Sequence, residues 1–158
     1  MRMEDGKMVK GRPSWDEYFA KIVEDVARRS TCTRRQIGSL IVNNEHEIVS
    51  TGFNGNVRGA PHCDDIGCIK DEMKLPSGSG HDWCTAVHAE QNALLQAGKA
   101  AKGAILYVNG FPCKICARLI VNAGIKKVVI SGEYPSKEGL DILSDAGIET
   151  VHIRLNEV

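Results

Sequence analysis

The sequence lacks an excess of charge of either sign. Its 20 Lys and Arg residues balance its 20 Asp and Glu residues, so net charge offers no argument for binding nucleic acid or a membrane surface. It also lacks an apolar run approaching the ~20 residues of a membrane-spanning helix. Residues 1–15, MRMEDGKMVKGRPSW, contain no apolar segment of the secretory kind. We therefore expect a cytoplasmic protein that binds neither nucleic acid nor membranes.

Internal repeats and low-complexity segments are absent as well, and 158 residues suffice for one domain. A domain of this length buries about 68–70% of the surface that its unfolded chain exposes, so it can hold a core without disulfides. We expect a flexible polar arm over residues 1–13 and a single domain over residues 14–158.

The six cysteines therefore need an explanation other than disulfide bonds that stabilise a small core. They are Cys32, Cys63, Cys68, Cys84, Cys113 and Cys116. An even count suits a disulfide framework in a small secreted protein. In a cytosolic protein, clustered cysteines more often bind a metal or take part in chemistry, so we expect metal ligands among them.

Apolar periodicity predicts a helix and then a hairpin in the first third of the chain. Ser14 and Glu17 have capping-box spacing, and the apolar residues that follow recur in an i, i+3, i+4 pattern, which predicts a helix at about 14–30. Residues 36–43 and 46–53 are apolar and β-branched, and they predict two antiparallel strands.

From residue 86 onward, predicted helices and strands alternate. The helices cover about 87–98, the stretch between Pro112 and Gly124, and about 136–146, and the strands cover 104–109, 126–131 and 149–154. Such alternation with short connections implies parallel strands and right-handed crossovers. We predict an α/β protein, a three-layer α/β/α domain whose mixed five-stranded sheet joins one antiparallel hairpin to a parallel half.

Residues 54–85 stand apart because they are rich in glycine and show little periodicity. A loop this long without its own structure is uncommon in a compact domain, so something is expected to organise it. The segment holds Cys63, Cys68 and Cys84 beside His62 and His81.

The stretch PCKIC at residues 112–116 is a candidate metal-binding motif. Proline favours the first turn of a helix, and two cysteines three residues apart share one helical face. The helix N-terminus also favours the thiolate, the form that binds metal. A pair of buried apolar cysteines or a redox dithiol explains the motif equally well when it is taken alone.

His88 and Glu90 lie two residues apart in TAVHAEQNALL. On a regular helix such residues point about 200° apart. They converge only at a helix start, so this helix is expected to begin near Ala86 or Val87. Taken singly, His88 reads as a structural histidine and Glu90 as a solvated carboxylate of the first turn.

The combination of the two motifs favours one site. A catalytic zinc ion takes three protein ligands and leaves one position open for water, and His88, Cys113 and Cys116 supply three. Both motifs open helices that we expect beside strands of the parallel half, so the helix N-termini are expected to meet at the carboxyl edge of the sheet. Glu90 would then stand beside the open position.

The pattern H-x-E followed by P-C-x-x-C resembles the signature of the zinc-dependent cytidine and deoxycytidylate deaminase superfamily. The resemblance extends from about Trp15 to Tyr134. The segments RSTCTRRQIGSLIV, STGFNG, PHCDD and AVHAEQNAL are similar to those of deoxycytidylate (dCMP) deaminases.

This resemblance implies a cytidine-deaminase-like fold and the hydrolysis of dCMP to dUMP and ammonia, in pyrimidine deoxynucleotide metabolism. Zn²⁺ would be held by His88, Cys113 and Cys116, and Glu90 would move the protons. The same signature serves deaminases of tRNA adenosine, of guanine and of the riboflavin pathway. A non-catalytic zinc-binding module is a further alternative, but such a module would not need Glu90.

The resemblance also implies substrate-binding roles. Asn54 would hydrogen-bond the sugar or the ring, Tyr134 would stack on the base, and Arg34 would bind the phosphate, with Arg35 as its rival. A turn tyrosine and two solvated loop arginines are the plain alternatives.

Some relatives carry a second, structural zinc. Cys32, Cys63, Cys68, His81 and Cys84 are five candidates for its four ligand positions, with ordinary buried thiols as the alternative. The resemblance finally implies a homo-oligomer, commonly a hexamer, with dCTP as activator and dTTP as inhibitor.

Overall fold

The computed structural model describes residues 2–4, 7–9, 11–77, 79–133 and 137–155. A five-stranded sheet with the order β4-β3-β7-β8-β9 forms its centre. These strands are β3 (Gly38–Val42), β4 (Ile48–Phe53), β7 (Ile105–Val108), β8 (Lys127–Ile130) and β9 (Glu149–His152). Strand β3 pairs antiparallel with β4 and β7, whereas β7, β8 and β9 run parallel. The predicted mixed sheet is confirmed.

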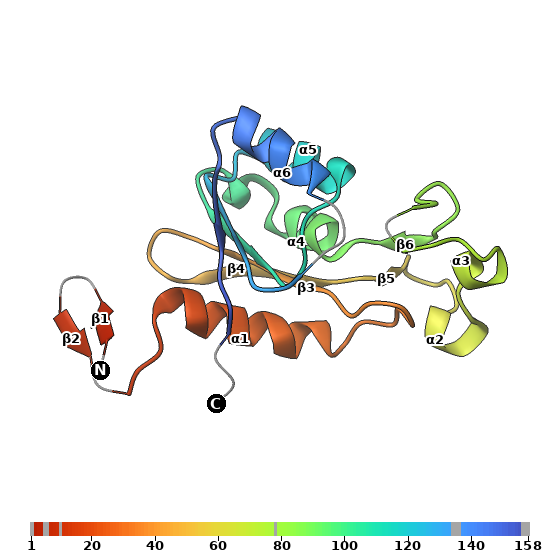
Figure 1. Cartoon of the computed structure of the whole chain (residues 1–158), viewed down its shortest axis with the longest axis horizontal. Helices are drawn as coiled ribbons and strands as arrows, with labels where there is room; N and C mark the ends of the chain where they lie inside the picture. Colours follow the sequence, from red (N-terminus) through yellow and green to blue (C-terminus); the bar gives the residue numbers. More distant parts are fainter. Residues whose placement is uncertain (1, 5–6, 10, 78, 134–136, 156–158) are drawn as a thin grey trace.

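Helices cover both faces of this sheet, which confirms the three predicted layers (Figure 1). Helix α1 (Trp15–Ala27) lies on one face. Helices α4 (Ala89–Ala97), α5 (Lys114–Ala123) and α6 (Glu138–Asp145) lie on the other, and a short 3₁₀ helix, η1 (Gly98–Ala101), follows α4.

Successive residues of the central strands point to opposite faces and enter two separate cores. Phe19 and Val23 of α1 pack with Leu40 and Tyr107. On the other face, a larger cluster includes Ile41, Leu106, Val108, Ile120 and Leu143.

The ends of the first elements follow from side-chain caps. Oγ of Ser14 accepts from the backbone N–H of Glu17 at 3.2 Å and opens α1 as predicted. In the hairpin, Oδ1 of Asn43 accepts from the backbone N–H groups of Glu45 and Glu47, both at 2.9 Å. The strands are therefore shorter than predicted, because the turn takes up residues 43–47.

Residues 54–85 are organised by backbone pairing and by two very short helices. Strand β5 (Gly55–Asn56) pairs with β6 (Ala86–Val87), which closes the segment at its base. Between them lie α2 (Cys63–Ile66) and α3 (Ile69–Glu72). The side chain of Asn56 donates to the carbonyl of Pro61 and accepts from the hydroxyl of Thr85, both at 2.7 Å. Helices of four residues are too short for a periodicity that sequence reasoning could detect.

The N-terminal arm, which we expect to be flexible, contains a small hairpin. Strands β1 (Arg2–Glu4) and β2 (Lys7–Val9) pair antiparallel, with Met3 opposite Met8. Among the described residues, no helix is both long enough and apolar enough to cross a membrane.

Two glycines let helices approach the hairpin closely. A Cβ at Gly38 would lie 2.5 Å from the carbonyl oxygen of Val23 in α1, and one at Gly52 would lie 2.3 Å from that of Ala89 in α4. Helix α4 therefore packs mainly on β4 and β3. The expectation that α4 lies beside the parallel half is wrong. Because Gly52 has no side chain, the backbone of α4 packs directly on the hairpin.

Candidate active site

His88 is the N-cap of α4, so its side chain reaches past the helix end. The helix begins at Ala89, later than the predicted 86 or 87. The backbone N–H of His88 donates to Oε1 of Gln91 at 2.9 Å, which fixes this end. Because His88 precedes the first helical residue, helical geometry does not force its side chain to point about 200° away from that of Glu90.

Cys113 has the corresponding place at α5. It is the N-cap, and its Sγ accepts from the backbone N–H of Cys116 at 3.4 Å. Pro112 therefore precedes the cap instead of lying in the first turn. Cys116 is buried in that first turn. Two helix N-termini thus present one histidine and two cysteines to each other.

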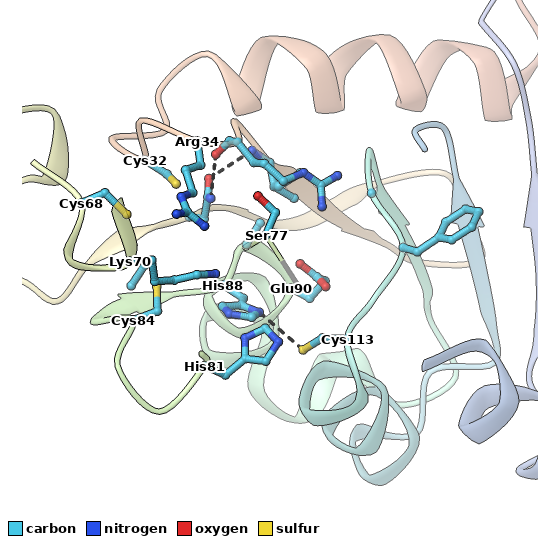
Figure 2. A pocket seen from close by; sticks show the side chains of 17 residues that line it. Cys32, Arg34, Cys68, Lys70, Ser77, His81, Cys84, His88, Glu90 and Cys113 are labelled. Atoms are coloured by element: carbon cyan, nitrogen blue, oxygen red, sulfur yellow. Dashed lines mark hydrogen bonds between the residues drawn. The ribbon is translucent and has the colours of Figure 1, made fainter. Parts of the chain in front are cut away.

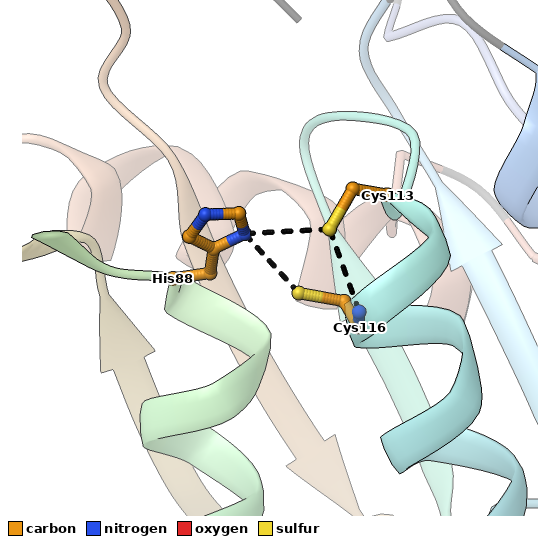
Figure 3. A group of neighbouring side chains, drawn as sticks. All are labelled: His88, Cys113 and Cys116. Carbon is orange, nitrogen blue, oxygen red and sulfur yellow. Dashed lines mark hydrogen bonds between the residues drawn. The ribbon is translucent and has the colours of Figure 1, made fainter. Parts of the chain in front are cut away.

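The ligand atoms of His88, Cys113 and Cys116 all lie within 4.8 Å of one another (Figure 3). Nδ1 of His88 is 3.6 Å from Sγ of Cys113 and 3.2 Å from Sγ of Cys116. A tetrahedral zinc ion with ordinary Zn–N and Zn–S bonds requires an N···S separation of about 3.6 Å. The donor set and its spacing therefore fit zinc. Among the described residues, this is the one group of His, Cys, Asp or Glu close enough to hold an ion.

The two thiols affect each other's ionisation. A hydrogen bond from Cys116 lowers the pKa of Cys113, and the same contact raises the pKa of Cys116. The hydrogen bond to Cys113 also raises the pKa of His88. Cys113 is therefore the thiol that ionises first, in the form that binds metal.

Glu90 lies in the first turn of α4 and is only 5% exposed. Burial raises the pKa of its carboxyl group above the ordinary range. A carboxyl group in such a place holds a proton closer to neutral pH and can return it, as a general acid–base requires.

His88, Glu90 and Cys113 line one open cleft of about 120 Å³ (Figure 2). Its walls come from the loop after α1, the end of β4, the segment 54–85 and the starts of α4 and α5. The cleft thus holds two of the three candidate zinc ligands, His88 and Cys113, together with side chains that the sequence predicts to bind substrate.

Asn54 lines this cleft but is mostly engaged by the protein. Its Oδ1 accepts from the hydroxyl of Ser30 at 2.5 Å and from the backbone N–H of Ile37 at 3.0 Å. Its Nδ2 donates to the carbonyl of Arg35 at 2.9 Å. An amide nitrogen carries two hydrogens, and the second has no acceptor among the described residues.

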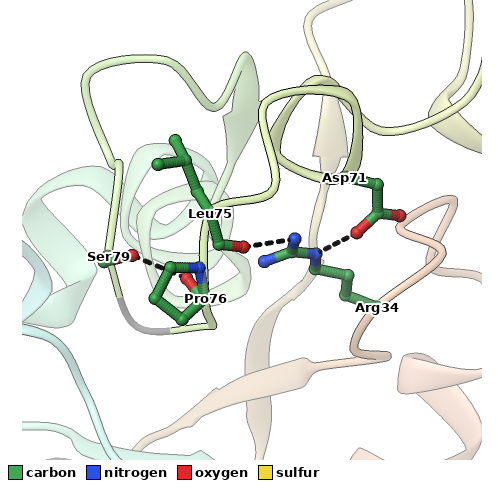
Figure 4. Close-up of polar contacts among 5 residues, drawn as sticks. All are labelled: Arg34, Asp71, Leu75, Pro76 and Ser79. Atoms are coloured by element: carbon green, nitrogen blue, oxygen red, sulfur yellow. Dashed lines mark hydrogen bonds and ion pairs between the residues drawn. The ribbon is translucent and has the colours of Figure 1, made fainter.

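Arg34 also lines the cleft, and the segment 54–85 holds its guanidinium (Figure 4). Nε donates to Oδ1 of Asp71 at 2.6 Å, and Nη2 donates to the carbonyl of Leu75 at 2.5 Å. Nη1 is buried and has no partner among the described residues. Arg35 lines the cleft as well, and its Nη2 donates to the carbonyl of Glu133 at 3.0 Å.

The candidates for a second zinc divide into two groups. The ring of His81 lies 5.7 Å from that of His88, on the side of the first cluster. The thiol of Cys63 lies within electrostatic reach of the other three cysteines, and burial together with these neighbours raises its pKa. These neighbours are Cys32, Cys68 and Cys84.

Tyr134 lies outside the described residues. Lys70, which sequence reasoning missed, lines the cleft and is only 8% exposed. It stands in a polar run, IKDEMK, whose pattern gives no sign that one lysine is buried.

Comparisons with known proteins agree with this geometry. Residues 13–132 match the family model described as the cytidine and deoxycytidylate deaminase zinc-binding region. The deoxycytidylate deaminase of Schizosaccharomyces pombe is 38% identical over 141 residues, covering 87% of this chain and 44% of that protein. That of Saccharomyces cerevisiae is 40% identical over 144 residues, with the same two coverages. The chain thus spans less than half the length of these two relatives.

A solved structure gives the same result. The crystal structure of the dCMP deaminase from cyanophage S-TIM5, in complex with dCMP and dUMP, superposes with a TM-score of 0.73 at 30% identity. The match covers 91% of this chain and 100% of that one. Since the family model spans most of the chain and the fold agrees, the chain belongs to the cytidine and deoxycytidylate deaminase family.

Proposed function

We propose that the chain catalyses the hydrolytic deamination of dCMP to dUMP with release of ammonia. One observation carries the proposal: the buried carboxyl group of Glu90 shares a cleft with the donor atoms of His88, Cys113 and Cys116. A non-catalytic zinc module would have no use for a buried acid at this place. The choice of dCMP is supported by the relatives, which are named deoxycytidylate deaminases.

His88 would hold the zinc ion through Nδ1, and Cys113 and Cys116 through their thiolates. When bound, zinc lowers the pKa of a water ligand toward about 7. The remaining work falls to the chain's own residues, which position the base and move protons.

Glu90 accepts a proton from the attacking water and delivers it to N3 of the cytosine ring. It then carries a proton to the amino group on C4, which leaves as ammonia. The water oxygen ends on C4 as the C4–N bond breaks, so one water is consumed for each ammonia released. Because the two transfers are sequential, one carboxyl group serves both.

Substrate binding is assigned to Asn54, Arg34 and Tyr134. The free N–H of Asn54 would reach the sugar or ring, and the unpartnered Nη1 of Arg34 would reach the phosphate. Tyr134 is proposed from the family resemblance alone, as the residue that stacks on the base.

A second, structural zinc is proposed on the four cysteines around the segment 54–85, which are Cys32, Cys63, Cys68 and Cys84. Cys63 lies within electrostatic reach of the other three, which supports this set. The four thiols would have to close around the ion, because they are not already grouped as tightly as His88, Cys113 and Cys116. The position of His81 beside His88 argues for leaving it out. A closed four-ligand site contributes directly to folding, which suits a segment with little apolar core.

The remaining proposals rest on the family resemblance. They are a single cytoplasmic deaminase domain over residues 14–158 behind an arm over residues 1–13, assembly into a homo-oligomer such as a hexamer, activation by dCTP and inhibition by dTTP.

Ammonia release from dCMP, CMP, deoxycytidine and dCTP tests the proposed reaction. We expect dCMP to give the highest kcat/KM. A preference for deoxycytidine, or no turnover of any cytosine compound by protein loaded with zinc, would refute the proposal.

A further inference from the structure

Lys70 is a buried lysine with no ion-pair partner in the part of the chain that the structure describes. It lies in the short helix α3 and is 8% exposed. Lysines are almost never buried to this extent unless they are paired. Within residues 11–77, 79–133 and 137–155, no carboxylate forms an ion pair with Lys70 and no acceptor hydrogen-bonds its ammonium group.

The side chain of Lys70 points into the cleft, between Arg34 and His88 (Figure 2). Arg34 adds Nη1, which is buried and has no partner among the described residues. The ammonium group of Lys70 and Nη1 of Arg34 thus both face the cleft. Asp71 forms an ion pair with Arg34 and leaves the charge of Lys70 uncompensated among the described residues. Leaving such groups desolvated is costly, and an anion in the cleft would relieve the cost.

We propose that Lys70 is a specificity-determining residue that receives the phosphate of the nucleotide, with Nη1 of Arg34 as the second donor. The inference rests on the proposed function, since it concerns the far end of the same substrate. Lysine binds phosphate as a mobile point charge, and arginine contributes directed N–H groups. The chemistry at the base does not sense the phosphate, so a residue that contacts the phosphate can select nucleotides over nucleosides.

Lys70→Met tests this role, because methionine removes the charge and keeps much of the apolar stem. We expect kcat/KM for dCMP to fall about 10–100-fold, as for the loss of a charge-assisted hydrogen bond. The loss should appear mainly in KM, and the turnover of deoxycytidine should change little. Lys70→Arg should recover most of the loss. Lys74→Met, at an exposed lysine of the same segment that does not line the cleft, is the matched control and should resemble the parent.

Equal losses for dCMP and deoxycytidine in folded, zinc-loaded Lys70→Met would overturn the proposal, as would an unchanged kcat/KM for dCMP. Equilibrium binding separates this outcome from failure of the proposed function, because it needs no turnover. The parent should bind dUMP more tightly than deoxyuridine, and Lys70→Met should lose that difference.

A measurement on the parent covers the case in which Lys70→Met does not fold. An amine-acylating reagent, read by mass spectrometry, should modify Lys70 more slowly when dUMP is present. Deoxyuridine should not protect Lys70, and neither compound should protect Lys74. Equal protection of Lys70 by dUMP and deoxyuridine, or none by either, would overturn the proposal.

Discussion

Nε of Arg34 donates to Oδ1 of Asp71 at 2.6 Å, across 37 residues of sequence. The same guanidinium donates through Nη2 to the carbonyl of Leu75 at 2.5 Å (Figure 4). Arg34, in the loop after α1, therefore holds the segment that carries α3 in place through Nε and Nη2. Its third nitrogen, Nη1, has no partner among the described residues and is available to a ligand in the cleft. Arg34 is thus a structural anchor as well as the proposed phosphate ligand.

Arg34→Ala should lower kcat/KM for dCMP by about 10–100-fold, because it removes a directed donor to phosphate. It should also lower the melting temperature, since the segment 54–85 loses its anchor. Steady-state kinetics with dCMP and deoxycytidine, together with thermal unfolding, check both effects. Asp71→Asn is the control: it weakens the anchor and leaves the guanidinium, so both substrates should change alike. If Arg34→Ala also affects both substrates alike, Arg34 serves only the fold.

Glu90→Gln should keep the fold and the zinc but lose turnover. The amide has nearly the same shape as the carboxyl group and cannot exchange protons, and general acid–base catalysis is typically worth about 10²–10⁴-fold. Ammonia release and metal content, measured on one preparation, check the expectation. Activity within about tenfold of the parent, only ~1.4 kcal/mol of barrier, would contradict the assigned role.

Metal analysis should find two zinc ions per chain. Cys63→Ser should retain one, with a lower melting temperature, because structural zinc contributes to folding. Cys113→Ser should lose the other. His81→Ala serves as the control and should retain both ions, because its ring lies beside His88. Parent protein with one zinc per chain would exclude the second site and leave the first unaffected.

Gly52→Ala should destabilise the protein and disturb the active site together. The new methyl group would lie 2.3 Å from the backbone oxygen of Ala89 and 2.5 Å from the backbone nitrogen of Ala93, so α4 must shift. Overpacking of this kind costs roughly 1–3 kcal/mol or more, and α4 carries Glu90. Denaturant unfolding and dCMP turnover measure the two effects. Thr51→Ala, at an exposed neighbour in the same strand, should cost under about 1 kcal/mol. Parent-like stability of Gly52→Ala would show that α4 is not held this closely.

Much of the fold could be predicted from the sequence because its signals are local. The cap at Ser14, the glycine at the end of α5 and the alternation of apolar residues each depend on neighbours within a few positions. Errors in the ends of elements had local causes too. At the hairpin, the hydrogen bonds that Asn43 accepts from Glu45 and Glu47 make the turn longer than the β-branched pattern indicates.

The grouping of His88, Cys113 and Cys116 was also predictable, for a different reason. Zinc restricts the ligands to a few residue types, and a helix start restricts their spacing, so His88 and the cysteine pair were recognisable before the fold was known. That both His88 and Cys113 are N-caps explains how those spacings bring the donor atoms together.

The sequence by itself thus determined the main helices and strands, their layers and the grouping of His88 with Cys113 and Cys116. The tertiary structure alone decided that Arg34 pairs with Asp71, that His81 lies with His88, and that Lys70 is buried in the cleft. These relations join segments that no helical or strand period connects. Their energies depend on desolvation and on charges brought together by folding. The residues next to a charged side chain in a polar run do not indicate whether it will be buried or which charge it will meet.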